Sequence, residues 1–396
     1  MNSEGAGRTT GRYLVLFAST EPKEAMESLR AIAGLSGMAV ASDFSEGAAA
    51  VEEIKRGGRL FLDEIGVAVV SVEPDQAKGL LSSIRGPHSP ILAVEPERVV
   101  YSAEPSDVLS WDESSVTWGL QAIGVPSTRY SGAGVNVALL DTGIDKTHPD
   151  LADRIEIEQS FVPGEDVQDG AGHGTHCAGT ICGPKRPQSR TRYGIAYNVG
   201  LMVAKVLDNN ERGEEGAVLA GIRWAVANGC RVISMSLSSR VRKDEPHSMV
   251  FEVTAQRLLR RGIVMVAAAG NDSSRAKSIV APVGRPASSP SIVAVGALDQ
   301  QLQVADFSNG STGDGRIDIV APGVAILSSF LLKENIRYAR TEGTSMATPH
   351  VTSVLALLAE AHPDLMGTDA VERLINGARA LPASSADVGA GLVQAP

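Results

Sequence analysis

The sequence predicts an α/β fold in which a parallel sheet carries helices on both faces, preceded by a small α+β unit. Two observations predict it. From about residue 116 onward, near-continuous apolar segments alternate with helical segments, which is typical of a parallel sheet buried on both faces. Before residue 104, the predicted elements follow the order β-α-β-β-α-β, which is that of small ferredoxin-like domains.

In the small unit, proline and glycine mark where one helix begins and ends. Pro22 lies at its start and Gly34 just past its end, positions that these residues prefer. The predicted elements are strand Tyr13–Phe17, helix Pro22–Ala33, strand Met38–Phe44, two strands within Arg59–Val72, helix Pro74–Ile84 and strand Ile91–Tyr101.

In the larger unit, apolar runs of strand length are separated by helical segments. The predicted strands are Val135–Leu140, Leu201–Leu207, Val232–Leu237, Ile263–Ala269 and Ile292–Ala297. The predicted helices are His173–Ile181, Ala217–Asn228, Met249–Arg261 and Ser345–Ala361. Because ligands bind at the carboxyl ends of strands in open α/β sheets, polar residues there are candidates for a site.

Composition narrows the class of protein. With 43% hydrophobic and 21% charged residues among 396, the chain is neither disordered nor collagen-like. A net charge of −10 without a basic stripe disfavours binding to nucleic acid or to an anionic membrane. The cysteines Cys177, Cys182 and Cys230 are too few for a disulfide framework, so we expect free thiols.

Composition also divides the chain into four parts. Residues 1–11 are expected to be a disordered lead, 12–104 the small unit, 105–115 a polar linker and 116–396 the larger domain. The early apolar run is too short for a signal peptide or a membrane span. The expected location is the cytoplasm by default, or outside the cell if the true start differs or export is non-classical.

Three segments carry the residue types of nucleophilic acyl transfer. Asp141 follows a buried strand, His173 begins a helix, and Ser345 begins the last long helix. A serine hydroxyl needs a base to take its proton, a carboxylate to orient that base, and N–H donors for the developing oxyanion. The backbone N–H of Ser345 at a helix start is one donor. Asn271, in the turn after the strand that ends at Ala269, offers a second.

From about Trp118 to Ala361 the chain resembles the subtilases, the subtilisin-like serine endopeptidases made with an N-terminal inhibitory propeptide. The resemblance rests on short motifs that match in order and spacing, and no single one of them would be specific. They are Asp141–Gly143, His148–Leu151, Gly172–Thr180, Val203–Asp208, Met235–Leu237, Val293–Ala297, Phe307–Asn309, Ala321–Gly323 and Gly343–Val351. The order Asp, His, Ser along the chain is that of subtilisin itself.

The resemblance implies a role for each matched residue. Ser345 is the nucleophile, His173 the general base and then acid, Asp141 the residue that orients His173, and the Asn271 amide an oxyanion donor. Two backbone segments flank a substrate peptide that binds as an added strand. They are Ser236, Leu237 and Ser238 on one side, and Ala268, Ala269 and Gly270 on the other.

The sequence departs from the family pattern at three places. Ser238 stands where glycine is usual, so a side chain there narrows the cleft or changes how the substrate strand sits. Thr352-Ser353 replaces the usual Ala-Gly after the nucleophile and is expected to shift helix packing. The usual calcium loop is replaced by the basic segment 182–192, although Asp150 is retained. Since calcium needs several oxygen ligands, the tight calcium site is expected to be lost, and no cofactor is expected to be required.

Other interpretations of the same residues are weaker. His173 and His176 lie three apart and suggest a metal pair, but no third ligand at suitable spacing follows, so His176 is expected to be structural. Cys177 lies on the same helix face as His173, and we expect a small buried residue rather than a second nucleophile.

The resemblance therefore predicts a monomeric serine endopeptidase that acts on polypeptides and is made as a self-processing zymogen. Its partner is its own N-terminal propeptide, with self-cleavage expected near Val99–Glu104. Two alternatives stay open. One is a latent or non-catalytic protein of the same fold, and the other is a dedicated maturation protease or transpeptidase for one partner peptide.

Overall fold

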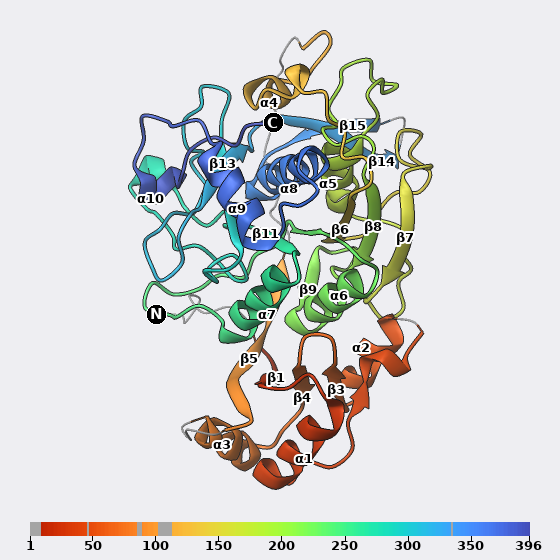
Figure 1. Ribbon diagram of the computed structural model, residues 1–396, viewed down its shortest axis with the longest axis vertical. Helices are drawn as coiled ribbons and strands as arrows, with labels where there is room; N and C mark the ends of the chain where they lie inside the picture. Colours follow the sequence, from red (N-terminus) through yellow and green to blue (C-terminus); the bar gives the residue numbers. More distant parts are fainter. Residues whose placement is uncertain (1–8, 46, 85–88, 102–112, 334–335) are drawn as a thin grey trace.

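The computed structural model describes residues 9–45, 47–84, 89–101, 113–333 and 336–396. A smaller unit, red to orange in Figure 1, lies below a larger one that runs from yellow through green to blue. The predicted lead and linker fall largely outside the described residues. None of the described helices is long and apolar enough to cross a membrane.

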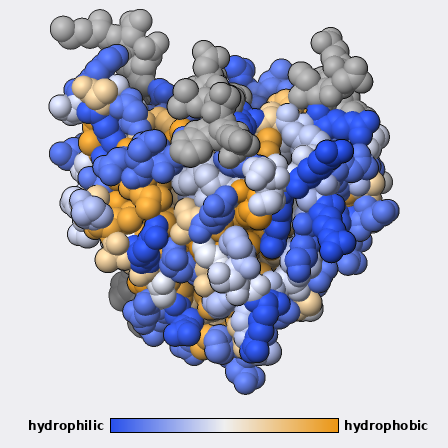
Figure 2. Space-filling model, turned by 90° about the horizontal axis from the view of Figure 1, so that it is seen from above, coloured by the Kyte–Doolittle hydropathy of each residue, from blue (hydrophilic) through white to orange (hydrophobic). Residues whose placement is uncertain are grey.

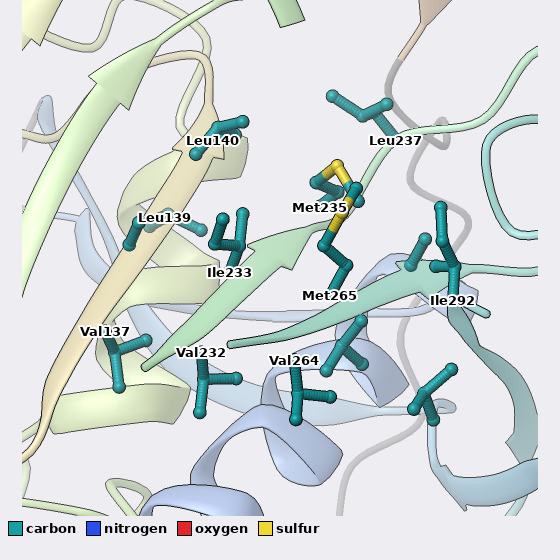
Figure 3. Packing of buried hydrophobic residues seen from close by; sticks show 14 of the residues in the cluster. Val137, Leu139, Leu140, Val232, Ile233, Met235, Leu237, Val264, Met265 and Ile292 are labelled. Carbon is teal, nitrogen blue, oxygen red and sulfur yellow. The ribbon is translucent and has the colours of Figure 1, made fainter. Parts of the chain in front are cut away.

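The larger unit is built on seven parallel strands in the order β13-β12-β11-β10-β6-β8-β7, which confirms the predicted α/β class. The strands are β6 Asn136–Asp141, β7 Ile155–Ser160, β8 Gly200–Lys205, β10 Val232–Met235, β11 Val264–Ala268, β12 Val293–Leu298 and β13 Ile319–Pro322. Every residue of β10, β11 and β12 is buried, as expected for strands covered on both faces. Figure 3 shows Val137, Val232 and Val264 side by side across the three central strands, in register.

Helices cover both faces of this sheet (Figure 1). They are α4 Trp118–Ala122, α5 His173–Cys182, α6 Glu215–Ala227, α7 Met249–Arg260, α8 Thr344–Ala361, α9 Gly367–Asn376 and α10 Ser385–Val388. α8 is buried from residue 344 to 359 and packs against β10 to β13 as well as against α5. An antiparallel hairpin of β14, Ile326–Lys333, and β15, Ile336–Thr341, packs on α5.

The small unit contains the predicted β-α-β-β-α-β order together with two further elements, the strand predicted over Met38–Phe44 and one helix that was not predicted. Its elements are β1 Thr9–Phe17, α1 Pro22–Ala33, β2 Ala39–Val40, α2 Gly47–Lys55, β3 Arg59–Leu62, β4 Val67–Val70, α3 Pro74–Ser83 and β5 Ile91–Tyr101. The strands β3-β4-β1-β5 are adjacent in that order, and each neighbouring pair is antiparallel. The sheet continues into the larger unit, because β5 pairs with β9, Arg212–Glu214.

Some boundaries differ from those predicted, for reasons of packing. β1 begins at Thr9, inside the predicted lead, and the strand predicted over Met38–Phe44 shrinks to Ala39–Val40. α2 was not predicted. It buries Val51 and Ile54 and lies against β3 and α6, so this short helix is held by tertiary contacts more than by local propensity.

The exposed surface offers few large apolar side chains among the described residues. The face shown in Figure 2 is mostly hydrophilic, and its hydrophobic side chains lie in separate groups between polar ones. The exposed large hydrophobic residues are Met26, Leu81, Leu92, Ile157, Met249, Ile279 and Met366. They come from seven different segments, and scattered apolar residues of this kind are ordinary on a folded surface.

Candidate active site

The predicted site residues converge at the carboxyl edge of the parallel sheet. Asp141 is the last residue of β6, Ser236 follows β10, and Asn271 follows β11 by three residues. His173 is the first residue of α5 and Ser345 the second of α8, and these two helices pack against each other. The sheet and the helix starts therefore bring together residues that lie up to 204 positions apart, Asp141 and Ser345.

Asp141 and His173 form a buried hydrogen bond of 2.7 Å between Oδ1 and Nδ1. The same carboxylate oxygen accepts from the backbone N–H of Thr142 at 2.7 Å. In the described part of the chain, Nε2 of His173 is buried and has no hydrogen-bond partner. Burial alone would lower the pKa of His173, but the charge and hydrogen bond of Asp141 raise it above its usual value. The ring is thus held with one nitrogen free to exchange a proton.

Ser345 makes a reciprocal contact with Ser236. Its Oγ donates to the Ser236 carbonyl at 3.0 Å, and Ser236 Oγ donates to the Ser345 carbonyl at 2.9 Å. Cys177 links Ser345 to the other two residues, since its Sγ lies 3.6 Å from the Ser345 carbonyl oxygen and within 4.8 Å of ligand atoms of Asp141 and His173. To reach His173, the Ser345 hydroxyl must turn away from the Ser236 carbonyl. The hydrogen bond between a nucleophile and its base often tightens only when substrate binds.

Thr344 holds the Asn271 side chain in place, a contact that the sequence did not predict. Its backbone N–H and its hydroxyl both donate to Asn271 Oδ1, at 2.8 and 2.9 Å. Because the amide oxygen is occupied, the NH2 group is the end of Asn271 left to donate. Ser345 follows Thr344 in the first turn of α8, where backbone N–H groups have no acceptor within the helix.

Asp169 is a second residue that the sequence reasoning missed. Its Oδ1 accepts from the Gly172 backbone N–H at 2.8 Å, and its Oδ2 accepts from the backbone N–H and hydroxyl of Thr175 at 2.9 and 2.7 Å. A carboxylate here satisfies the free N–H groups at the start of α5. An acidic residue four positions before His173 was the available signal.

His176 and Cys177 are both buried, and each has a backbone carbonyl oxygen as its neighbour. His176 Nε2 lies 2.8 Å from the Ile326 carbonyl oxygen, and burial lowers its pKa to about 3, so the ring is neutral. Burial raises the pKa of the Cys177 thiol well above its usual value. Among the described residues, Asp141, His173 and Cys177 form the one compact group of possible metal ligands. Nδ1 of His173 in this group is hydrogen-bonded to Asp141.

The two predicted flanking segments are joined by a third, at Gly284 and Arg285. Ser239 and Arg285 exchange backbone hydrogen bonds of 2.8 and 2.9 Å, and the Gly284 N–H donates to the Ala269 carbonyl at 2.8 Å. Of the predicted substrate-binding residues, Ala268 is the last residue of β11, and the carbonyls of Ala269 and Gly270 already accept hydrogen bonds. The remaining three, Ser236, Leu237 and Ser238, follow β10.

The residues around Asp150 do not fit a calcium ion. Its Oδ2 accepts from the hydroxyls of Tyr193 and Tyr338 at 2.7 and 2.8 Å, and its Oδ1 accepts from the Gln188 N–H at 3.1 Å. Burial raises the pKa of both tyrosines, so their hydroxyls remain donors. Both carboxylate oxygens thus face hydrogen-bond donors rather than further oxygen ligands.

Thr352 and Ser353 of α8 each donate a side-chain hydrogen bond. Thr352 Oγ1 donates to Ser234 Oγ at 2.9 Å, and Ser353 Oγ donates to the Pro349 carbonyl at 2.7 Å within the helix. Both residues are fully buried. The two larger polar side chains are therefore accommodated by hydrogen bonds.

Comparison with known proteins is consistent with this geometry. The model of the subtilase family matches residues 132–391. Subtilisin of Bacillus pumilus is 38% identical over 284 residues, which is 70% of this chain and 97% of the relative. Subtilisin E of Bacillus subtilis is 38% identical over 265 residues, 66% of this chain and 65% of the relative. The alkaline protease of Alkalihalobacillus alcalophilus is 36% identical over 83% of this chain and 84% of the relative, an alignment that reaches into the small unit.

The raised pKa of His173 predicts the pH dependence of Ser345 reactivity. Only neutral imidazole accepts the serine proton, so labelling by a fluorophosphonate should fall as the pH drops below that pKa, with a midpoint above the usual 6.5. Asp141→Asn should move the midpoint to lower pH and slow labelling at neutral pH by about 10⁴-fold. The measurement is the labelling rate between pH 5 and 9. An unchanged midpoint in Asp141→Asn would contradict the inference that Asp141 raises the pKa of His173.

Proposed function

Because the chain belongs to the subtilase family of serine-type endopeptidases, we propose that Asp141, His173 and Ser345 form its catalytic triad and that it is made as a self-processing zymogen. The observation that carries the proposal is the buried 2.7 Å hydrogen bond between Asp141 and His173. It leaves Nε2 of His173 without a partner among the described residues, and α5, which His173 begins, packs against α8, which carries Ser345.

The reaction follows from these positions. Ser345 Oγ turns from the Ser236 carbonyl to His173 Nε2, gives up its proton and attacks the peptide carbonyl carbon. The oxyanion accepts hydrogen bonds from the Asn271 amide and the Ser345 backbone N–H. His173 then gives its proton to the leaving amine, and the C–N bond breaks to leave an acyl-enzyme. His173 then takes a proton from a water molecule, which attacks the carbonyl carbon of the ester. The proton returns to Ser345 Oγ as the acid product leaves.

Asp141 and Thr344 act by positioning in this reaction. Asp141 keeps the proton of the neutral ring on Nδ1 and stabilises the imidazolium that forms during attack. Thr344 holds Asn271 before substrate arrives, so little reorganisation is needed when charge develops. A polypeptide substrate would lie extended along residues 236–238, with 268–270 on the opposite side.

The small unit would act as a docked propeptide. Two of its carboxylates face helix starts of the larger unit: Glu97 Oε1 accepts from the Gly216 N–H at 2.7 Å, and Glu95 Oε1 accepts from the Val250 N–H at 3.1 Å. Negative charge is favourable at these helix N-termini. Together with the pairing of β5 and β9, these contacts support a specific association that leads the end of the small unit toward the larger one.

Self-cleavage would fall beyond the described end of β5. Val99–Tyr101, the first part of the region in which cleavage is expected, is paired with β9. A bond within a paired strand is not free to enter an active site. The rest of the expected region, residues 102–104, lies outside the described residues.

Ser345→Ala is expected to stop self-processing. Intact-mass spectrometry after equal incubation should show the wild type split between the two units and the variant at full length. His173→Ala combined with Ser345→Ala should be no worse than either alone, because the residues act as a unit. The exposed Ser82→Ala should process as the wild type does.

The masses also separate the alternative functions. Hydrolysis adds one water, whereas a transpeptidase joins chains without it. A wild type that stays whole after prolonged incubation would contradict self-processing and favour the latent protein.

Docking of the small unit is expected to weaken as the pH rises. Burial raises the pKa of Glu215 to about 8, and although Arg285 and the Arg98 N–H lower it, Glu95 and Glu97 raise it further. Separation would expose Glu215 and restore the ordinary value of 4.5. The docked state therefore binds the extra proton, and its affinity should fall between these two pKa values by at most about tenfold per pH unit.

Size-exclusion chromatography of the processed complex, inactivated by fluorophosphonate, tests this at pH 5, 7 and 9. The two parts should co-elute at pH 5 and separate increasingly toward pH 9. Glu215→Gln should weaken the pH dependence of this separation, while Glu24→Gln on α1 should leave it unchanged. If the two parts separated more readily at low pH, the proposed role of Glu215 would be wrong.

We also propose that the Asp150 region is stable without calcium. A chelator should leave the midpoint of thermal unfolding unchanged. Asp150→Ala should destabilise the protein by about 1–3 kcal/mol, because tyrosine hydroxyls lose their acceptor. The exposed Asp153→Ala in the same turn is the matched control. Loss of several degrees on chelation, restored by calcium, would contradict the proposal.

A further inference from the structure

Ser238 lies close to the nucleophile and carries a side chain that no partner uses. It follows Ser236 by two residues, and the Ser236 carbonyl accepts the hydrogen bond of Ser345 at 3.0 Å. In the described part of the chain, Ser238 Oγ is buried and has no hydrogen-bond partner. A buried hydroxyl without a partner needs an explanation, because such groups are rare in folded proteins.

Three backbone segments surround this hydroxyl. Ser239, the next residue, is paired with Arg285, and Gly284 is hydrogen-bonded to Ala269. A Cβ atom placed on Gly284 would lie 2.2 Å from Ser238 Oγ, and one placed on Gly270 would lie 3.2 Å from it. Ser238 Oγ therefore occupies the space that two glycines leave open between the segments.

This space is where a substrate side chain would have to go. In the proposed reaction the carbonyl carbon under attack would lie at Ser345 Oγ, and its oxygen would face Asn271. The residue that bears this carbonyl would then lie between the segment that begins at Ser236 and the segment that ends at Asn271. Its side chain would enter between these two segments, toward Gly284, where Ser238 Oγ lies.

We propose that Ser238 restricts the peptidase to short side chains, such as alanine or serine, in the residue that supplies the scissile carbonyl. The inference rests on the proposed endopeptidase function and names its substrate class. Removing the side chain of Ser238 would return the space beside Gly284 and Gly270 to the substrate. A pocket that gains the room of a CH2OH group then accepts an aromatic ring that it previously excluded.

The test uses two tetrapeptide p-nitroanilides that differ only in the last residue, alanine or phenylalanine. For the processed wild type, kcat/KM should be at least about 10-fold higher for alanine. Ser238→Gly should raise the ratio of kcat/KM for phenylalanine to that for alanine by about 10-fold or more. Ser238→Ala, which keeps Cβ, should lie between them.

A matched control is Thr254→Val, which removes another buried side-chain hydroxyl without a partner in the described part of the chain, on α7 and outside the three segments. It should leave the alanine-to-phenylalanine ratio unchanged. An unchanged ratio in both Ser238 variants, with Ser345 still labelled by fluorophosphonate, overturns the role of Ser238 but leaves the endopeptidase intact. A wild type that neither is labelled nor releases nitroaniline overturns both.

Discussion

The buried hydrogen bond between Asp141 and His173 is the contact on which the rest of the site depends. A carboxylate at 0% exposure is costly unless it is paired and hydrogen-bonded, and here the imidazole and the Thr142 N–H both donate to Oδ1, while Oδ2 is buried without a partner among the described residues. The pairing requires the start of α5 to lie against the end of β6. Asp169 secures that start by accepting from Gly172 and Thr175, so a second buried carboxylate serves to place the first pair.

The sequence predicts a feature when the residues that cause it are close together in the chain. The strands β6, β8, β10, β11 and β12 were predictable from apolar runs, and Asp141, His173 and Ser345 from short motifs, because each of these signals lies within a few neighbouring residues. The strand β7 was missed because it lies at the sheet edge, where its residues are only partly buried and are mostly polar. The hydrogen bonds of Asp150 to Tyr193 and Tyr338 were not predictable, since they join residues 43 and 188 positions apart. Local pattern carries no information on such pairs.

The surface between the two units has a different physical character from the core. Five carboxylates and three guanidinium groups gather there, several of them buried. They are Glu95, Glu97, Glu214, Glu215, Glu245, Arg12, Arg98 and Arg285. Paired charges of this kind add little net stability compared with apolar packing, but a wrongly placed partner would leave charges buried and unpaired. Such an interface can therefore be specific and yet remain separable.

The unpartnered Nε2 of His173 argues against a latent protein that merely retains the fold. In the described part of the chain this buried nitrogen has no hydrogen-bond partner, and a buried group of this kind needs an explanation. Asn271, the proposed donor to an oxyanion, is also held in place by two hydrogen bonds from Thr344. Both features lower stability or restrict motion in the resting protein, and both have a use once a peptide carbonyl is attacked. A scaffold freed from catalysis would have no reason to keep the two together at one sheet edge.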